Sequence, residues 1–164
     1  MNFRATFASL ALSAALVAGP AFAAQPFEGA WQEKHNDTPG ITTPANFKLT
    51  IWMKVEGDQL HYHSENTTQP DKPYISDHIS KLDGTVAPFP DQVRFNQVST
   101  LVTEPTELQI LKMKDGDVIA GEFWTISKDG KTAVRRGVGK SPEGKSRAYQ
   151  EHFVRVTAEP QFKK

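Results

Sequence analysis

Between residues 47 and 56 the sequence alternates strictly between apolar and mostly polar side chains. Successive side chains of a β-strand point to opposite faces, so this period of two predicts a strand with one apolar face turned inward. The apolar set is Phe47, Leu49, Ile51, Met53 and Val55, and the other set is Lys48, Thr50, Trp52, Lys54 and Glu56. Gly57-Asp58 then turns the chain and residues 60–64 return it, which predicts a β-hairpin.

Turn sequences recur along the rest of the chain, roughly every 8 to 12 residues. They separate predicted strands at residues 27–34, 47–56, 60–64, 74–82, 93–102, 106–114, 118–127, 132–138 and 146–156. Asp83-Gly84 is predicted to be a turn, and residues 88–90 a turn or sheet edge because of their two prolines. A long antiparallel meander must close or stack to protect its edges. We therefore predict an all-β fold, a single up-and-down antiparallel barrel, with a two-sheet sandwich as the alternative.

The first 23 residues have the order of parts found in a secretory signal peptide. Arg4 supplies the positive charge, residues 5–17 are mostly apolar, and residues 19–23 combine a helix break with small residues suited to cleavage. The apolar run is shorter than the roughly 20 residues that span a bilayer. We expect a cleaved signal peptide at 1–23, no integral membrane segment in the mature chain, and one domain at 24–164 in the periplasm or outside the cell.

The charge balance and the lack of cysteine exclude several classes of protein. The chain has 19 Lys and Arg against 19 Asp and Glu, so no basic excess points to nucleic acid. It has no cysteine, so its stability must come from a hydrophobic core rather than from disulfides.

Ser76-Asp77-His78 contains the residue types of a hydrolytic triad, but on a strand these side chains alternate in direction and lie too far apart. We expect no catalysis and no cofactor.

Gly29-Ala30-Trp31 is a G-x-W motif near the start of the first predicted strand. It resembles the opening motif of lipocalins, where the Trp closes one end of the barrel and an Arg from the last strands packs over it. Arg155 or Arg147 would take that place here. The chain also resembles a group of small secreted bacterial lipocalin-like proteins with calycin-type barrels, through G-x-W, through Asp83-Gly84 with prolines after it, and through the S-x-D-G-K-T segment at 127–132. This resemblance implies a barrel that holds a small apolar molecule.

The inward-facing residues of such a barrel are the candidates for ligand contact. Barrels of about eight strands either fill their interior with side chains or hold one small ligand. The loop at 35–46 would cover an open end. We predict noncatalytic binding of a small, partly apolar molecule, with a solid core as the opposing interpretation. The candidate residues are Phe47, Leu49, Ile51, Met53, Tyr62 and Phe95.

His61 and His63 support an alternative function. On a strand they share one face about 7 Å apart, a spacing at which two imidazoles can share a metal ion. A third ligand would have to come from one of the other histidines, His35, His78 or His152. The opposing interpretation places Leu60 and Tyr62 inward and leaves both histidines in solvent beside Lys54.

Trp52 supports a third hypothesis, an interaction or inhibitor module of the cell envelope. It lies among charged and polar residues on the outward face of its predicted strand. An outward Trp either lies under a loop or anchors a partner. The sequence identifies no protein partner.

Overall fold

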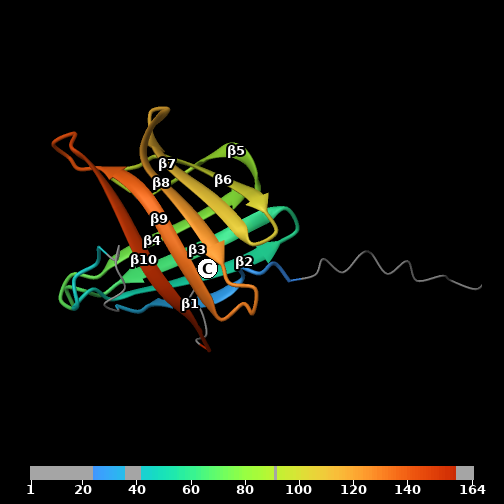
Figure 1. The fold of residues 1–164 in the computed structure, drawn as a ribbon. Coiled ribbons are helices and arrows are strands. Elements are labelled where there is room, and N and C mark those ends of the chain that lie inside the picture. The colour runs from blue at the N-terminus through green and yellow to red at the C-terminus, as the bar shows by residue number, and fades with distance from the viewer. Residues whose placement is uncertain (1–23, 36–41, 91, 158–164) are drawn as a thin grey trace, which may run out of the picture.

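The computed structural model describes residues 24–35, 42–90 and 92–157 (Figure 1). The predicted signal peptide at 1–23 lies outside the described residues, and so do residues 36–41 of the predicted loop at 35–46. Within the described ranges no helix has the length and apolar character needed to cross a membrane.

Ten antiparallel strands form one sheet that curls into a nearly closed barrel. Their order across the sheet is β4-β3-β2-β1-β10-β9-β8-β7-β6-β5. Figure 1 shows β7 to β10 in front of β2 to β4, with the two groups crossing at an angle. The prediction of an all-β up-and-down barrel is confirmed. The strands are β1 (Gly29–Glu33), β2 (Leu49–Glu56), β3 (Gln59–Asn66), β4 (Tyr74–Lys81), β5 (Asp83–Pro88), β6 (Gln97–Glu104), β7 (Glu107–Lys114), β8 (Asp117–Ile126), β9 (Thr132–Lys140) and β10 (Ser146–Val156).

β5 is the strand that the sequence did not predict. Its residues are exposed or half-buried, so it lacks the alternation of a strand with one buried face. Gly84 has a φ of 86°, and the pairing with β6 shifts register between Asp83 and Val86. The expected turn at Asp83-Gly84 is therefore a distorted beginning of an edge strand. Such irregularity is typical of sheet edges.

Trp31 closes one end of the barrel. It is fully buried, and its indole Nε1 donates a hydrogen bond to the carbonyl oxygen of Phe27 at 2.8 Å. The Arg155 guanidinium carbon lies 4.3 Å from the centroid of the indole ring, a cation–π contact. Arg155 also donates hydrogen bonds to the carbonyls of Pro26 and Gly130, both at 2.6 Å. It therefore ties the segment before β1 to the β8–β9 turn.

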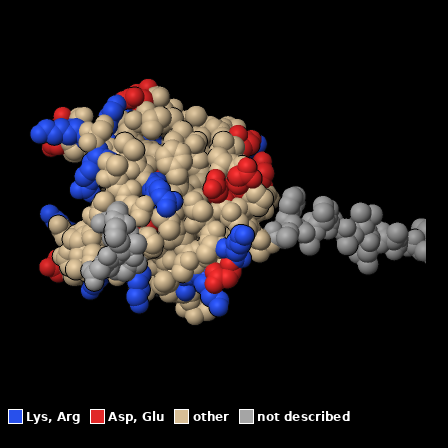
Figure 2. Space-filling view, viewed as in Figure 1, with Lys and Arg blue, Asp and Glu red and all other residues tan. Residues whose placement is uncertain are grey.

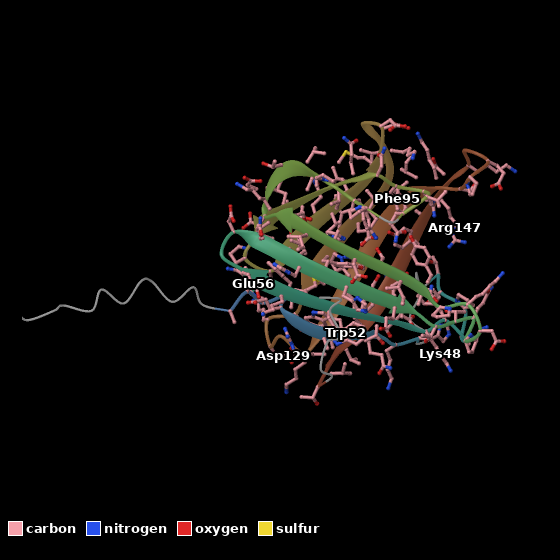
Figure 3. All side chains as sticks on the ribbon, turned by 180° about the vertical axis from the view of Figure 1, so that it is seen from behind. Lys48, Trp52, Glu56, Phe95, Asp129 and Arg147 are labelled. Carbon is pink, nitrogen blue, oxygen red and sulfur yellow. The ribbon has the colours of Figure 1, made fainter. Side chains whose placement is uncertain are left out.

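Of the two arginines considered for this place, Arg155 occupies it and Arg147 does not. Arg147 lies near the opposite end of β10 (Figure 3). Gly29 allows the close approach of Arg155, because a Cβ at position 29 would lie 2.5 Å from Nη1 of Arg155. Gly29 also has a φ of 113°, a conformation that favours glycine. Both residues of the G-x-W motif therefore have a structural role: Gly29 leaves room for Arg155, and Trp31 packs beneath it.

β4 and β5 meet without a hydrogen-bonded ladder, and we call this line of contact the seam. Side chains cross it within the described ranges. Ser80 on β4 and Thr100 on β6 share a buried hydroxyl–hydroxyl bond of 2.7 Å. Leu82, the residue that links β4 to β5, bonds to both neighbouring strand pairs: its amide donates to the carbonyl of Asp58 at 3.0 Å, and its carbonyl accepts from the amide of Val102 at 3.1 Å.

Ser80→Ala is expected to lower the free energy of unfolding by about 1 kcal/mol, because the Thr100 hydroxyl would stay buried without this partner. Urea denaturation of the wild type, Ser80→Ala, Thr100→Val and the double variant measures the coupling. The double variant should cost little more than the larger single variant. Fully additive losses would show that the bond does not stabilise the seam.

Candidate ligand-binding cavity

A cavity of about 950 Å³ opens at the end of the barrel away from Trp31. Its walls come from β4 and β7 to β10, from the end of β3, and from the segments 42–47 and 92–95. Figure 3 shows Phe95 and Arg147, two of its lining residues, at the same end of the molecule. Sites for small molecules generally measure about 300–1,000 Å³. The barrel interior is therefore open enough at this end to admit one.

Small inward residues on β8 and β9 create this space. A Cβ added at Gly139 would meet no atom of another residue nearer than 3.8 Å, the distance to Ala120 Cβ and to the Ile119 carbonyl. Gly137, two residues earlier, is different, because the Tyr149 ring lies directly over it. A Cβ there would lie 2.3 Å from Cζ of Tyr149. Gly137 thus lets Tyr149 lie flat against the wall, while Gly139 leaves part of the cavity empty.

Four buried charged side chains lie side by side at the inner end of the cavity, and we call them the charged row. They come from four adjacent strands: Lys112 (β7), Glu122 (β8), Arg135 (β9) and Glu151 (β10). Lys112 Nζ lies 2.7 Å from Glu122 Oε1, and Arg135 Nη1 lies 3.2 Å from Glu122 Oε2. Arg135 Nε lies 2.5 Å from Glu151 Oε2. Positive and negative groups therefore alternate, and each charge has a partner.

Glu122 and Arg135 of the charged row stay ionised near neutral pH. Burial alone would raise the pKa of Glu122, but the charges of Lys112 and Arg135 lower it to about 2. The two carboxylates of the row, Glu151 first, raise the pKa of Arg135 against the effect of its burial. Burial, reinforced by the charge of Glu122, raises the pKa of Tyr149, so its hydroxyl stays neutral. The row offers a ligand hydrogen-bonding groups but no net charge.

The mouth of the cavity adds positive charge. Arg94 and Arg147 line it, and Arg94 Cζ lies 5.2 Å from the ring centroid of Phe95. Figure 2 shows more basic than acidic side chains at the end of the molecule that carries the β9–β10 turn, at the left of the view. Since the charged row is balanced, these two arginines give the described lining a positive excess.

The six residues that the sequence predicts as ligand contacts lie in three different places: the cavity, the packed core and a second pocket. Phe47 and Phe95 line the cavity. Tyr62 is buried and lines a smaller pocket near the seam. The remaining three, Leu49, Ile51 and Met53, belong to the packed hydrophobic core and do not line the cavity. The barrel thus combines the two alternatives, a solid core at one end and an open space at the other.

His61 and His63 lie on the outer face of β3, but they do not share the same environment. His61 is partly exposed, whereas the side chain of His63 is only 3% exposed, so the expectation that both face solvent is wrong for His63. Its Nε2 lies 3.1 Å from Glu65 Oε1, and its Nδ1 contacts Asp77. In the ranges that the structure describes, no three His, Asp or Glu side chains are grouped so that they would hold a metal ion.

Trp52 lies on the outer face of β2 but is only 9% exposed. Its ring centroid is 5.1 Å from that of His63, which pairs with it across the two strands. The burial of Trp52 therefore contradicts the expectation of an accessible anchor for a partner. The two buried side chains, Trp52 and His63, form a small cluster outside the barrel.

The charged row is the feature that the sequence analysis missed. A signal for it exists in the alternation of β7 and β8. Leu108, Ile110 and Lys112 share the inward face of β7, and Glu122 shares the inward face of β8 with Trp124. An ionisable residue inside an apolar alternation, present on two consecutive strands with opposite charge, predicts a buried ion pair.

No protein-family profile matches the chain, and no curated protein matches its sequence. Among solved structures, the zebrafish ileal bile acid-binding protein complexed with cholic acid is 15% identical with a TM-score of 0.50, over 80% of this chain and 99% of that chain. Apo lipid binding protein 8 of Caenorhabditis elegans is 17% identical with a TM-score of 0.49, over 80% and 96% of the two chains. At such identities the likeness concerns the fold alone. The chain has a calycin-like, nearly closed antiparallel barrel.

Proposed function

We propose that this protein binds a small, partly apolar molecule in the cavity and does not catalyse a reaction on it. The observation that carries the proposal is the 950 Å³ space bounded by aromatic side chains on one side and by the charged row on another. Leu49, Ile51 and Met53 belong with Trp31 to a packed core, so this space is a local feature of the barrel. Larger apolar pockets with a few convergent polar groups are the usual binding sites of such folds.

The lining favours an amphipathic ligand. Phe47, Ile75 and Phe95 offer apolar surface, whereas Tyr149 and the charged row offer hydrogen bonds. Because the ion pairs of the row satisfy one another, the cavity does not need a ligand to compensate a buried charge. The two arginines of the mouth favour an acidic group on the ligand at that end. Cholic acid, the ligand in the zebrafish structure, belongs to the proposed chemical class, because it combines an apolar body with an acid group.

Gly139→Phe is expected to weaken ligand binding at least about tenfold, because the new ring would project into the empty part of the cavity. Val138→Phe is the matched control, since residue 138 is 51% exposed on the outer face of the same strand. Fluorescence titration with anilinonaphthalene sulfonate, and competition with dodecanoate, measures the affinity. The proposal fails if the wild type binds neither compound, or if both variants weaken binding equally.

We also propose that the chain is exported and that its mature form begins at Ala24. The order of charge, apolar run and small residues in 1–23 supports this. Mass spectrometry of the protein from a periplasmic or culture fraction should give the mass of residues 24–164. An intact mass that includes residues 1–23 in that fraction would contradict the proposal.

A further inference from the structure

A second pocket of about 410 Å³ lies at the seam, separate from the cavity. Its walls include Tyr62, His78 and Ile79 on one side and Pro88 and Pro90 on the other. None of its lining residues lines the cavity. The pocket lies where β4 and β5 leave the seam without a ladder, and neither Pro88 nor Pro90 has an amide hydrogen to donate across it.

An aromatic row separates this pocket from the cavity. The His78 ring lies 4.7 Å from the Tyr62 ring in a stacked arrangement and 5.0 Å from the Phe89 ring. Phe89 in turn stacks on Phe95, a lining residue of the cavity, at 6.1 Å. A molecule in the pocket and a molecule in the cavity would therefore lie on opposite sides of these rings.

His78 is a buried imidazole whose hydrogen bonds are unmet. It is 4% exposed, and neither Nδ1 nor Nε2 has a hydrogen-bond partner among the described residues. Folded proteins rarely bury a polar side chain without a partner, because the desolvation is then uncompensated. Burial, together with the charge of Lys112, lowers the pKa of His78 to about 3. The ring is therefore neutral at ordinary pH, with one nitrogen that donates and one that accepts.

We propose that the seam pocket is a second binding site, for a small neutral aromatic molecule that carries a hydroxyl group. The walls formed by Tyr62, Ile79 and the two prolines suit a flat apolar ring. His78 forms part of the wall, and a hydroxyl group, which both donates and accepts, suits a neutral imidazole in either tautomer. Asp77 also lines the pocket and disfavours an anion there. The site takes a different chemical class from the amphipathic ligand of the cavity.

The first test compares phenol with toluene, which has the same shape but no hydroxyl. In the wild-type mature domain, phenol should shift the imidazole resonances of His78 in NMR spectra and bind more tightly than toluene. His78→Phe keeps the stack on Tyr62 but removes both nitrogens, and it should weaken phenol binding about tenfold while leaving toluene binding within about twofold. His152→Phe is the matched control, because His152 lies on the outer face of β10 away from the seam.

A second variant and a second probe distinguish the possible outcomes. Ile79→Trp fills the pocket from a residue that is 49% exposed, so the fold should tolerate it, and it should abolish phenol binding. Binding of anilinonaphthalene sulfonate in the cavity should stay unchanged in both variants. No shift of His78 with phenol, or equal binding of phenol and toluene, would overturn the second site. Loss of sulfonate binding without loss of phenol binding would contradict the separation of the two sites, because a change at the seam would then have altered the cavity.

Discussion

Arg135→Met is expected to lower the free energy of unfolding by about 3–5 kcal/mol, because it leaves two buried carboxylates with too few cations. Arg135 contacts both Glu122 and Glu151, and after the change Glu151 has no ion-pair partner in the charged row. The guanidinium also lies 5.3 Å from the Trp124 ring, so its loss removes packing as well as charge. Chemical denaturation at neutral pH measures the change.

Two variants make this result specific to the charged row. Arg136→Met changes the next residue of β9, whose exposed side chain donates a hydrogen bond to Gln150 Oε1 at 3.0 Å, and it should cost less than about 0.5 kcal/mol. Arg135→Met combined with Glu151→Leu leaves Glu122 paired with Lys112, and it should recover a large part of the loss. If Arg135→Met costs no more than Arg136→Met, the row does not stabilise the fold.

Arg135→Met should also change how the free energy of unfolding depends on pH. The folded pKa of Glu122, about 2, lies below the ordinary value of 4.5. A carboxyl group with a lowered folded pKa stabilises the protein above its unfolded pKa, and this contribution disappears as the pH falls from about 5 toward 2. Removing Arg135 removes one of the two cations that lower this pKa. Denaturation midpoints should therefore fall less steeply with pH in Arg135→Met than in the wild type over that range.

Trp31→Ala is expected to cost about 3–5 kcal/mol, the usual range for the loss of a large buried aromatic side chain. The indole is fully buried and bonds to the carbonyl of Phe27, so its removal leaves a void and an unmet acceptor. Arg155 would also lose the ring on which it packs. Urea denaturation measures the loss, and the change in Trp fluorescence on unfolding remains available from Trp52 and Trp124.

Trp31→Phe is the control for this prediction. It keeps a ring under Arg155 but removes the indole donor, so it should cost much less than Trp31→Ala. Neither change should weaken ligand binding in the cavity, because Trp31 does not line it. An equal loss of stability in both variants would mean that the hydrogen bond to Phe27, and not the packing of the ring, dominates at this end of the barrel.

The sequence predicted most of the strands because their signals are local. The alternation at 47–56 identifies β2 without knowledge of its neighbours, and G-x-W identifies the closed end of the barrel. β5 was not predicted because an exposed edge strand buries neither face and therefore shows no alternation. The choice between Arg155 and Arg147 needed the pairing of β1 with β10, in which Trp31 lies opposite Arg155.

The candidate site was less predictable because it depends on which strands are adjacent. The burial of His63 arises from Trp52 and Asp77 on the two flanking strands, and its own strand gives no sign of it. The same holds for Leu49, Ile51 and Met53. Their inward direction follows from the alternation, but whether they meet a void or a neighbour depends on the small residues of β8 and β9. Direction is a local property, whereas empty space is a property of the whole barrel.

The position of β1 between β2 and β10 sets a condition on how the chain folds. Glu28 and Arg155, which bond at the closed end, are 127 positions apart in the sequence. Contacts between such distant positions carry a high entropic cost of loop closure and slow the folding of β-proteins. During synthesis, hairpins such as β2–β3 can form as they emerge, but β1 lacks one neighbour until β10 has been made. Completion of the last strand is therefore the earliest point at which the barrel can close.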